Sequence, residues 1–174
     1  AEAYGDAHQV IGNFHELHPE IKFKVITKVP HDVVAGEIVQ KVRTYINDLS
    51  VNCLEVLMFH SFDSYENNRS IIAVLNNLKN LGLIKHVGVS VYTNSQIETL
   101  LSDDNVTVVQ MPFNLLDNES IRGDLMNRMK AKGKIIHTRS AFLQGLFFKE
   151  QFENNSIAQK LSMELTAIKN ITKE

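Results

Sequence analysis

Runs typical of strands and runs typical of helices alternate along the chain, and this alternation limits the folds that the chain can adopt. Five short runs are rich in β-branched and other apolar residues. A helix between two strands carries the chain back to the same end of the sheet, so consecutive strands are expected to pair in parallel. The strand-like runs are 21–28, 54–60, 85–91, 106–113 and 134–140.

Between these strands the apolar residues recur at helical spacing. Gly82 and Gly133 follow two of the helical runs, and glycine is the residue most typical of a helix C-terminus. A further apolar stripe begins at Ser156 near the end of the chain. The helices are expected at 35–49, 67–82, 94–102 and 119–133.

The strands are apolar on both faces, which indicates a sheet that is covered on both sides. Two architectures fit this pattern, an open doubly wound sheet and a closed (βα) barrel. A G-x-G-x-x-G turn after the first strand would favour the open sheet, and the sequence contains none. We therefore expect the α/β class and a (βα)8 TIM barrel, present here as an incomplete portion, with residues 1–174 forming a single domain.

Composition argues against several classes of partner. The formal net charge of −2 offers no basic field for phosphates, so nucleic acid is not expected. Neither an apolar run of about 20 residues nor a secretion signal is visible, so no membrane association is expected. Cys53 is the single cysteine and can form no intrachain disulfide. A cytoplasmic protein is the expectation.

Polar residues occur where the predicted strands end. In a (βα) barrel the chemistry lies at the C-terminal ends of the strands, so these residues are candidates for a site. Taken alone, a histidine or lysine at a strand end is more often structural, but several at one rim carry more weight. The candidates in chain order are Thr27, Lys28, His60, Ser90, Gln110, Arg139 and Ser140.

Side-chain alternation predicts which of these residues share a face. Met58 and His60 lie two residues apart and therefore point to the same side of their strand. If that side lines the barrel, the His60 side chain points into its open end, and Lys28 on the neighbouring strand lies at the same level. A lysine and a histidine placed together suit chemistry directed at a carbonyl group.

Six segments, in order, make the chain resemble the aldo-keto reductase family over residues 1 to about 148. "AEAYG" matches the end of the family's D-x-A-x-x-Y-G signature, and "VITK" and "LMFHSFDS" match its lysine and histidine strand ends. "HVGVSVY" resembles the G-V-S strand, "VVQMPFNLLD" the Q-x-x-Y-N strand, and "RSAFLQGLF" the Y-S-P-L-x-x-G segment. By the family's plan the chain would hold strands three to seven of eight.

The resemblance implies a catalytic tetrad, of which three members fall on Tyr4, Lys28 and His60. Tyr4 would donate the proton, Lys28 would lie beside it, and His60 would orient the carbonyl. The fourth member would be an aspartate two positions before Ala1, outside this sequence. A free tyrosine has a pKa near 10, and a neighbouring ammonium group favours the phenolate, which makes a tyrosine a better acid near neutral pH.

The resemblance also implies a reduced nicotinamide cofactor, NADPH or NADH. Ser90 and Gln110 would hold its amide, and further contacts to the cofactor would fall on Arg139 and Ser140. Phe113 replaces the tyrosine of the family's Q-x-x-Y-N strand, and two residues near the cofactor also depart from the family's pattern. Arg139 stands where most members have a tyrosine that stacks on the nicotinamide, and Val91 replaces a common asparagine.

Three functions are compatible with these residues. The leading hypothesis is an NAD(P)H-dependent reductase of a small-molecule aldehyde or ketone, with little activity expected from these 174 residues alone. The second is a catalytically weak, nucleotide-binding regulatory barrel. The third is a Schiff-base aldolase using Lys28, which would need that lysine desolvated. Substrate, NADP preference and oligomeric state do not follow from the sequence.

Two histidines in "HELH" at 15–18 could suggest a metal site. No third ligand at a known spacing accompanies them in the sequence, so we expect a solvated helix end and no metal.

Overall fold

The computed structural model describes residues 4–149 and 156–171. Its centre is a five-stranded sheet in which every neighbouring pair is parallel and the strands lie in chain order, which confirms the prediction. β1 and β5 form its two edges. The strands are β1 (Ile26–Val29), β2 (Leu54–Phe59), β3 (Ile84–Ser90), β4 (Val108–Pro112) and β5 (Ile135–Arg139).

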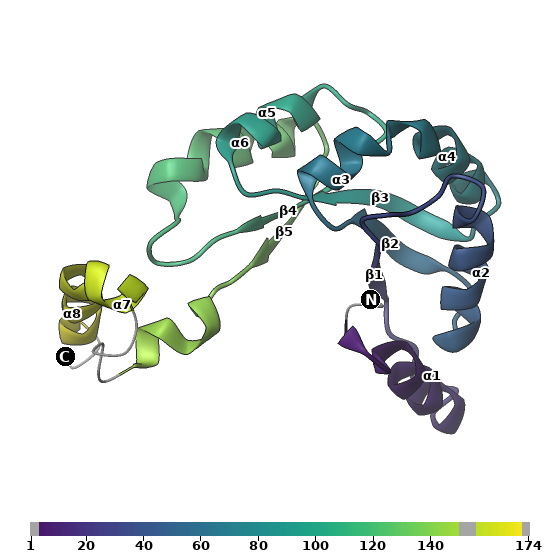
Figure 1. The fold of residues 1–174 in the computed structure, drawn as a ribbon, viewed down its shortest axis with the longest axis horizontal. Coiled ribbons are helices and arrows are strands. Elements are labelled where there is room, and N and C mark those ends of the chain that lie inside the picture. Colours follow the sequence, from purple (N-terminus) through teal and green to yellow (C-terminus); the bar gives the residue numbers. More distant parts are fainter. Residues whose placement is uncertain (1–3, 150–155, 172–174) are drawn as a thin grey trace.

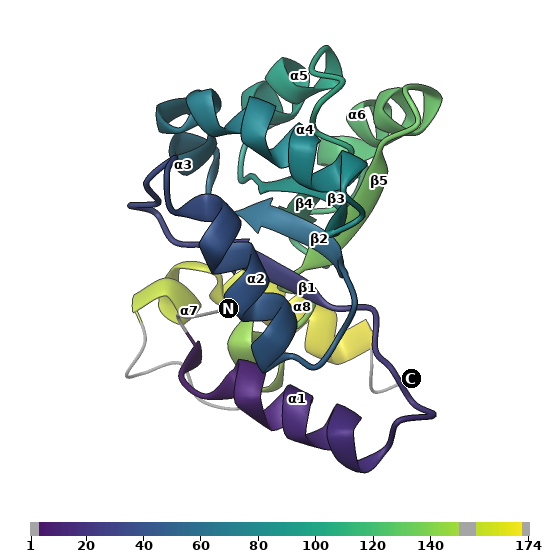
Figure 2. The ribbon, with the colours of Figure 1, turned by 90° about the vertical axis from the view of Figure 1, so that its right-hand side faces the viewer.

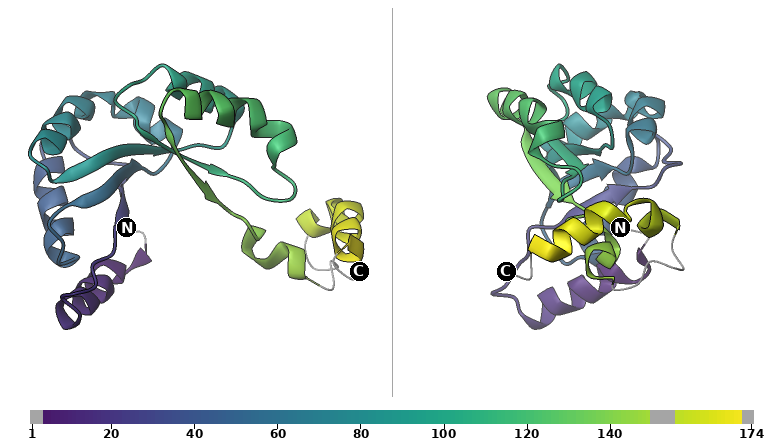
Figure 3. Two further views of the ribbon diagram at one scale, coloured as in Figure 1. Left: turned by 180° about the vertical axis from the view of Figure 1, so that it is seen from behind. Right: turned by 90° about the vertical axis from the view of Figure 1, so that its left-hand side faces the viewer.

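The sheet curves into an arc, and the helices that connect the strands lie along its convex side (Figure 1; Figure 3, left). These helices are α2 (Ile38–Asp48), α3 (Phe62–Asn67), the 3-10 turn η2 (Arg69–Ile71), α4 (Ile72–Asn80), α5 (Asn94–Leu101) and α6 (Glu119–Ala131). The convex face is thus the outer wall of a barrel.

The remaining helices lie at the two ends of the arc. Figure 2 shows α1 (Ala7–Leu17) beside α2 at the β1 end of the sheet. At the other end, η3 (Leu143–Phe148) continues from β5 and packs with α7 (Ser156–Lys160) and α8 (Ser162–Ile171) in a small separate apolar cluster.

Alternation along β2 divides its side chains between two apolar clusters. Leu57 and Phe59 belong to the large core under the outer helices, whereas Val56 and Met58 form a small inner cluster with Val108. All five are at most 2% exposed. Burial of each such side chain contributes roughly 1.5–3 kcal/mol, so both faces of the strand stabilise the fold.

The first helix after β2 begins earlier than the sequence indicates. The helix expected at 67–82 is preceded by α3, which begins at Phe62 because the Ser61 hydroxyl accepts the Ser64 N–H at 3.1 Å and caps its first turn. His60 is therefore held between the end of β2 and a helix cap.

β1 is also shorter than the strand expected at 21–28. Residues before Val25 contact α1 in place of a strand: the Lys22 ammonium donates to the His15 carbonyl at 3.0 Å, and the Phe23 N–H donates to the His15 ring. Pairing with β2 then runs through Ile26–Val29.

The expectation of a solvated helix end for "HELH" is wrong for His15. This residue is fully buried; its Nδ1 donates to the Leu49 carbonyl at 2.7 Å and its Nε2 accepts the Phe23 N–H at 3.0 Å. Both ring nitrogens are engaged, so His15 joins α1 to the end of α2. Across the described part of the chain, helices are too short or too polar to cross a bilayer.

Candidate active site

The register of the five strands builds continuous rows of side chains on the inner, concave face. One row runs from Lys28 through Met58 and Gly88 to Val108 and Ile135. Because Met58 and Val108 belong to the inner cluster, Lys28 lies on the inner face beside them. The cluster thus forms an apolar floor beneath the C-terminal rim of the strands.

A second row, closer to the rim, joins Ser90, Gln110 and His137. Ser90 is only 2% exposed and the other two are half-buried. Within residues 4–149 and 156–171, none of these three side chains makes a hydrogen bond to protein. Buried polar groups are usually paired, so this row offers a hydroxyl, an amide and an imidazole to a ligand.

The charge of Lys28 acts on His60 at this rim. Burial lowers the pKa of Lys28, and the positive charge of Arg139 lowers it further. Burial, followed by the charges of Lys28 and His31, lowers the pKa of His60. His60 is therefore neutral at neutral pH, and a neutral imidazole can donate one N–H to a carbonyl oxygen.

His31, in the loop after β1, is part of this site although the sequence analysis missed it. Its ring stacks on that of His60, with centroids 4.7 Å apart and planes 23° apart. Nothing in the local pattern marks His31, because the loop "VPHDVVAG" has neither strand nor helix spacing.

Arg139 leaves β5 on the inner face and reaches back across β4. Its Nη2 donates to the Val91 carbonyl at 3.2 Å, just beyond β3, and its Nη1 donates to the Ser140 hydroxyl at 3.3 Å. The guanidinium carbon lies 4.2 Å from the centre of the Tyr92 ring. Arg139 thus occupies the rim with one face already covered by an aromatic ring, as sequence alone did not show.

The loop that carries Tyr92 is fixed by a buried arginine. Arg122 donates to the Tyr92 carbonyl at 2.8 Å and to the Asn94 side chain at 3.0 Å, and it binds both oxygens of Asp117 at 2.6 Å. The side chain of Arg122 is 6% exposed. Sequence reasoning did not find this network because its members come from three separate segments.

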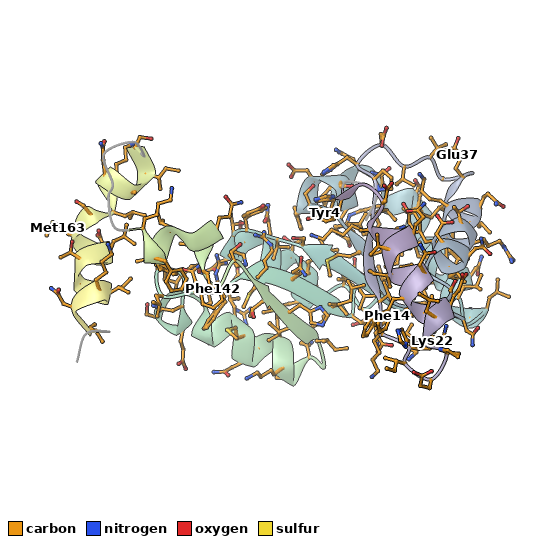
Figure 4. The ribbon with its side chains drawn as sticks, turned by 90° about the horizontal axis from the view of Figure 1, so that it is seen from below. Tyr4, Phe14, Lys22, Glu37, Phe142 and Met163 are labelled. Carbon is orange, nitrogen blue, oxygen red and sulfur yellow. The ribbon has the colours of Figure 1, made fainter. Side chains whose placement is uncertain are left out.

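Tyr4 lies before α1, at the start of the described chain, and is 66% exposed (Figure 4). Among the described residues, no hydrogen bond joins Tyr4 to Lys28 or His60. The structure thus brings together Lys28, His60, Ser90, Gln110 and Arg139, with Ser140 next to Arg139, while the role of Tyr4 stays a prediction.

A cavity of about 600 Å3 lies near η3 and α8, and its lining includes Phe113, directly after β4, and Ala141, next to Ser140. Its walls are mainly apolar and include Phe113, Phe142, Phe147 and Phe148. Phe113 packs against the outer core, whereas Gln110 lies on the inner face. None of the rim residues lines the cavity, namely Lys28, His60, Ser90, Gln110 and Arg139.

Comparison with known proteins assigns the family. The sequence matches the aldo/keto reductase family over residues 1–172, and the chain belongs to that family. Its members are oxidoreductases that generally use nicotinamide cofactors. A search of curated proteins found no match.

Solved aldo-keto reductase structures share the fold. An aldo-keto reductase from Bacillus halodurans superposes with a TM-score of 0.68 at 16% identity, over 86% of this chain and 53% of that one. A metagenome aldo-keto reductase from the Medee deep-sea basin gives 0.68 at 18% identity, over 94% and 60%. The glycerol dehydrogenase of Gluconobacter oxydans gives 0.66 at 18%, over 86% and 49%.

The chain therefore spans about half to three fifths of the length of these structures. At such identities the superposition establishes the fold, an α/β arrangement corresponding to part of the family's (βα)8 barrel. This confirms the predicted fold class and the predicted resemblance.

Proposed function

We propose that the protein reduces an aldehyde or ketone to an alcohol at the inner rim of the sheet, with NADPH or NADH as the hydride source. One observation carries the proposal. Lys28, His60, Ser90 and Gln110 share the rim without hydrogen-bond partners among the described residues, in a chain that belongs to a family of oxidoreductases. A location in the reducing cytoplasm agrees with Cys53 being the single cysteine of the sequence.

The proton chemistry falls on three side chains. Tyr4 donates a proton to the carbonyl oxygen as negative charge develops there, and the Lys28 ammonium stabilises the phenolate that remains. His60, kept neutral by burial and by Lys28, donates a hydrogen bond to the same oxygen. Each group thus acts on one atom of the substrate.

The cofactor's amide fits the second row. A carboxamide has one acceptor and two donors, and the Ser90 hydroxyl and the Gln110 amide can satisfy both kinds. Val91 has no side-chain amide where the family commonly has an asparagine, so one amide contact fewer is expected. The bound cofactor supplies the hydride, and this row positions it.

Tyr4→Phe, made in the full-length protein, tests the proposal. The variant should bind reduced cofactor as the parent protein does, measured by cofactor fluorescence, but should lose aldehyde-dependent cofactor oxidation by at least about a hundredfold, the usual share of general acid catalysis. Unchanged turnover in the variant would remove Tyr4 from this role.

Lys28→Met and Lys24→Met form a matched pair for the same assay. Lys28 faces the rim, whereas the Lys24 side chain is 78% exposed before β1. Turnover should fall only in Lys28→Met. Cofactor binding without turnover in the unmodified full-length protein would instead favour the regulatory, nucleotide-binding alternative.

A further inference from the structure

We propose that His31 is a positioning residue: its ring holds the His60 imidazole in the plane from which that imidazole donates to the substrate's carbonyl oxygen. The inference rests on the proposed function, in which His60 is the donor, and adds the residue that sets the donor's direction. Three observations support it. They are the ring contact of the two histidines, the lack among the described residues of a hydrogen bond that could orient His60, and the anchored backbone of His31.

The direction of a hydrogen bond from His60 depends on the plane of its ring. A neutral imidazole carries one N–H, which lies in the ring plane, and a hydrogen bond weakens steeply when donor, hydrogen and acceptor are no longer nearly in line. In proteins a partner at the second ring nitrogen commonly sets the orientation of such a histidine. The contact that fixes the ring plane therefore decides how well His60 can serve the substrate.

For His60 that contact is the ring of His31. Within residues 4–149 and 156–171, neither ring nitrogen of His60 makes a hydrogen bond to protein, whereas both ring nitrogens of His15 do. The His31 ring stacks on His60 with centroids 4.7 Å apart and planes 23° apart. A nearly parallel stack restricts tilting of the His60 ring and leaves its edge, where the N–H lies, open to a substrate.

The backbone of His31 is anchored on both sides. Val29 and Val33, two residues before and two residues after it, are 1% and 7% exposed and belong to the large outer core. Pro30 between them has a restricted φ. The Asn68 side-chain amide donates to the His31 carbonyl at 3.5 Å. These contacts place the His31 ring before any substrate arrives.

One short helix connects the two histidines. α3 begins two residues after His60, where the Ser61 hydroxyl caps its first turn, and Asn68 follows its last residue. The Asn68 side chain donates to the Ser64 carbonyl within this helix at 2.8 Å and also to the His31 carbonyl. His60, α3 and the His31 loop thus form one closed unit, and the two rings meet where it closes.

The His31 side chain does little else for the fold. It is exposed, and in the described part of the chain its ring makes no hydrogen bond or ion pair and stacks on His60 alone. Exposed side chains without such partners contribute little to stability. A change at His31 that lowers turnover without lowering stability would therefore report on His60.

The experiment compares His31→Ala with His31→Phe in the full-length protein, with benzaldehyde and NADPH as probes. His31→Ala should lower kcat/KM for benzaldehyde by about tenfold, the effect of roughly one well-aligned hydrogen bond. His31→Phe keeps a stacking ring and should restore most of the loss. Both variants should retain the parent's NADPH affinity, measured by cofactor fluorescence, and its urea midpoint.

Two controls match these variants. His18→Ala removes another histidine, whose side chain is 47% exposed at the end of α1, and should leave kcat/KM unchanged. Asn68→Ala should reproduce part of the loss by releasing the His31 loop, whereas Asn67→Ala, an exposed neighbour in α3, should not. Unchanged kcat/KM in His31→Ala, or a His31→Phe variant as slow as His31→Ala, would overturn the proposal.

A measurement without substrate separates this inference from the proposed function. 13C relaxation at the His60 Cδ2–H bond reports motion of the ring, which should increase in His31→Ala but not in His31→Phe or His18→Ala. If the parent protein reduces no aldehyde and this pattern of ring motion is found, the proposed function alone is wrong. If the parent is active and the His60 ring is as rigid in His31→Ala as in the parent, this inference alone is wrong.

Discussion

Several polar side chains on the outer face of the sheet are hydrogen-bonded, whereas, in the described part of the chain, a row on the inner rim is not. On the outer face, Thr27 bonds His8 at 2.9 Å, and the Lys134 ammonium donates to two backbone carbonyls at 2.6 and 2.7 Å. On the inner rim, Ser90 and Gln110 have no such partners among the described residues. Satisfied polar groups stabilise a fold, whereas unsatisfied ones in a semi-buried rim are available to a ligand.

The same contrast is visible in titratable groups. Burial, together with the hydrogen bond to Asp103, raises the pKa of Tyr65 on the outer side, so this phenol keeps its proton and serves structure. On the inner rim, burial and Lys28 lower the pKa of His60 and leave it neutral, ready to donate to an incoming oxygen. Position on the sheet thus separates structural from chemical roles.

The largest loss of stability is expected from truncating a core side chain on the outer face. Leu57→Ala removes a side chain that is 1% exposed in the large core and should lower the free energy of unfolding by about 2–5 kcal/mol. Gln110→Ala on the inner rim is the matched change and should cost less than about 0.5 kcal/mol. Urea unfolding measures both, and equal losses would contradict the division of roles.

A smaller loss of stability is expected at the Arg122 network, which connects α6 to the loop after β3. Arg122→Met removes the buried partner of Asp117 and the donor to the Tyr92 carbonyl, so unfolding free energy should fall by about 3 kcal/mol. Arg128→Met, which breaks an exposed pair with Glu98, should change it by less than about 1 kcal/mol. A larger loss of unfolding free energy in Arg128→Met than in Arg122→Met would argue against a stabilising role of the Arg122 network.

The smallest change is expected in the dependence of stability on pH. Because the pKa of His60 is lower in the folded chain than the ordinary value near 6.5, the unfolded chain takes up the proton first, and stability falls as pH drops below that value. Lys28→Met should raise the pKa of His60 and weaken this acid sensitivity.

NMR titration of the His60 ring, combined with unfolding at pH 7.5 and 5.5, measures this change. Lys24→Met is the control, since its side chain is exposed and is not among the causes of the His60 shift. An unchanged His60 titration in Lys28→Met would show that Lys28 does not act on it.

Features that depend on the spacing of neighbouring residues could be predicted from the sequence. Period-two alternation placed Met58 and His60 on one side, and the inner cluster around Met58 confirms that face. Gly82 and Gly133 adopt positive φ after α4 and α6, as their positions indicated. The register then aligns Ser90 with Gln110, as strand ends of a parallel sheet require.

Features that depend on distant segments could not be predicted. His15 is buried although a histidine near a helix end is usually solvated, because Leu49 and Phe23 approach it from elsewhere in the chain. The stacking of His31 on His60 and of Arg139 on Tyr92 likewise depends on loop geometry. Such contacts have no periodic signature.

We expect the inner rim, and not the outer face or the apolar cavity near η3, to bind the reduced cofactor. A 1H–15N NMR titration of the protein with NADPH tests this most directly. We expect shifts at the Gln110 side-chain amide and at the backbone N–H groups of Ser90 and Val91. Shifts confined to Phe142 and Phe148, or to the outer helices, would contradict it.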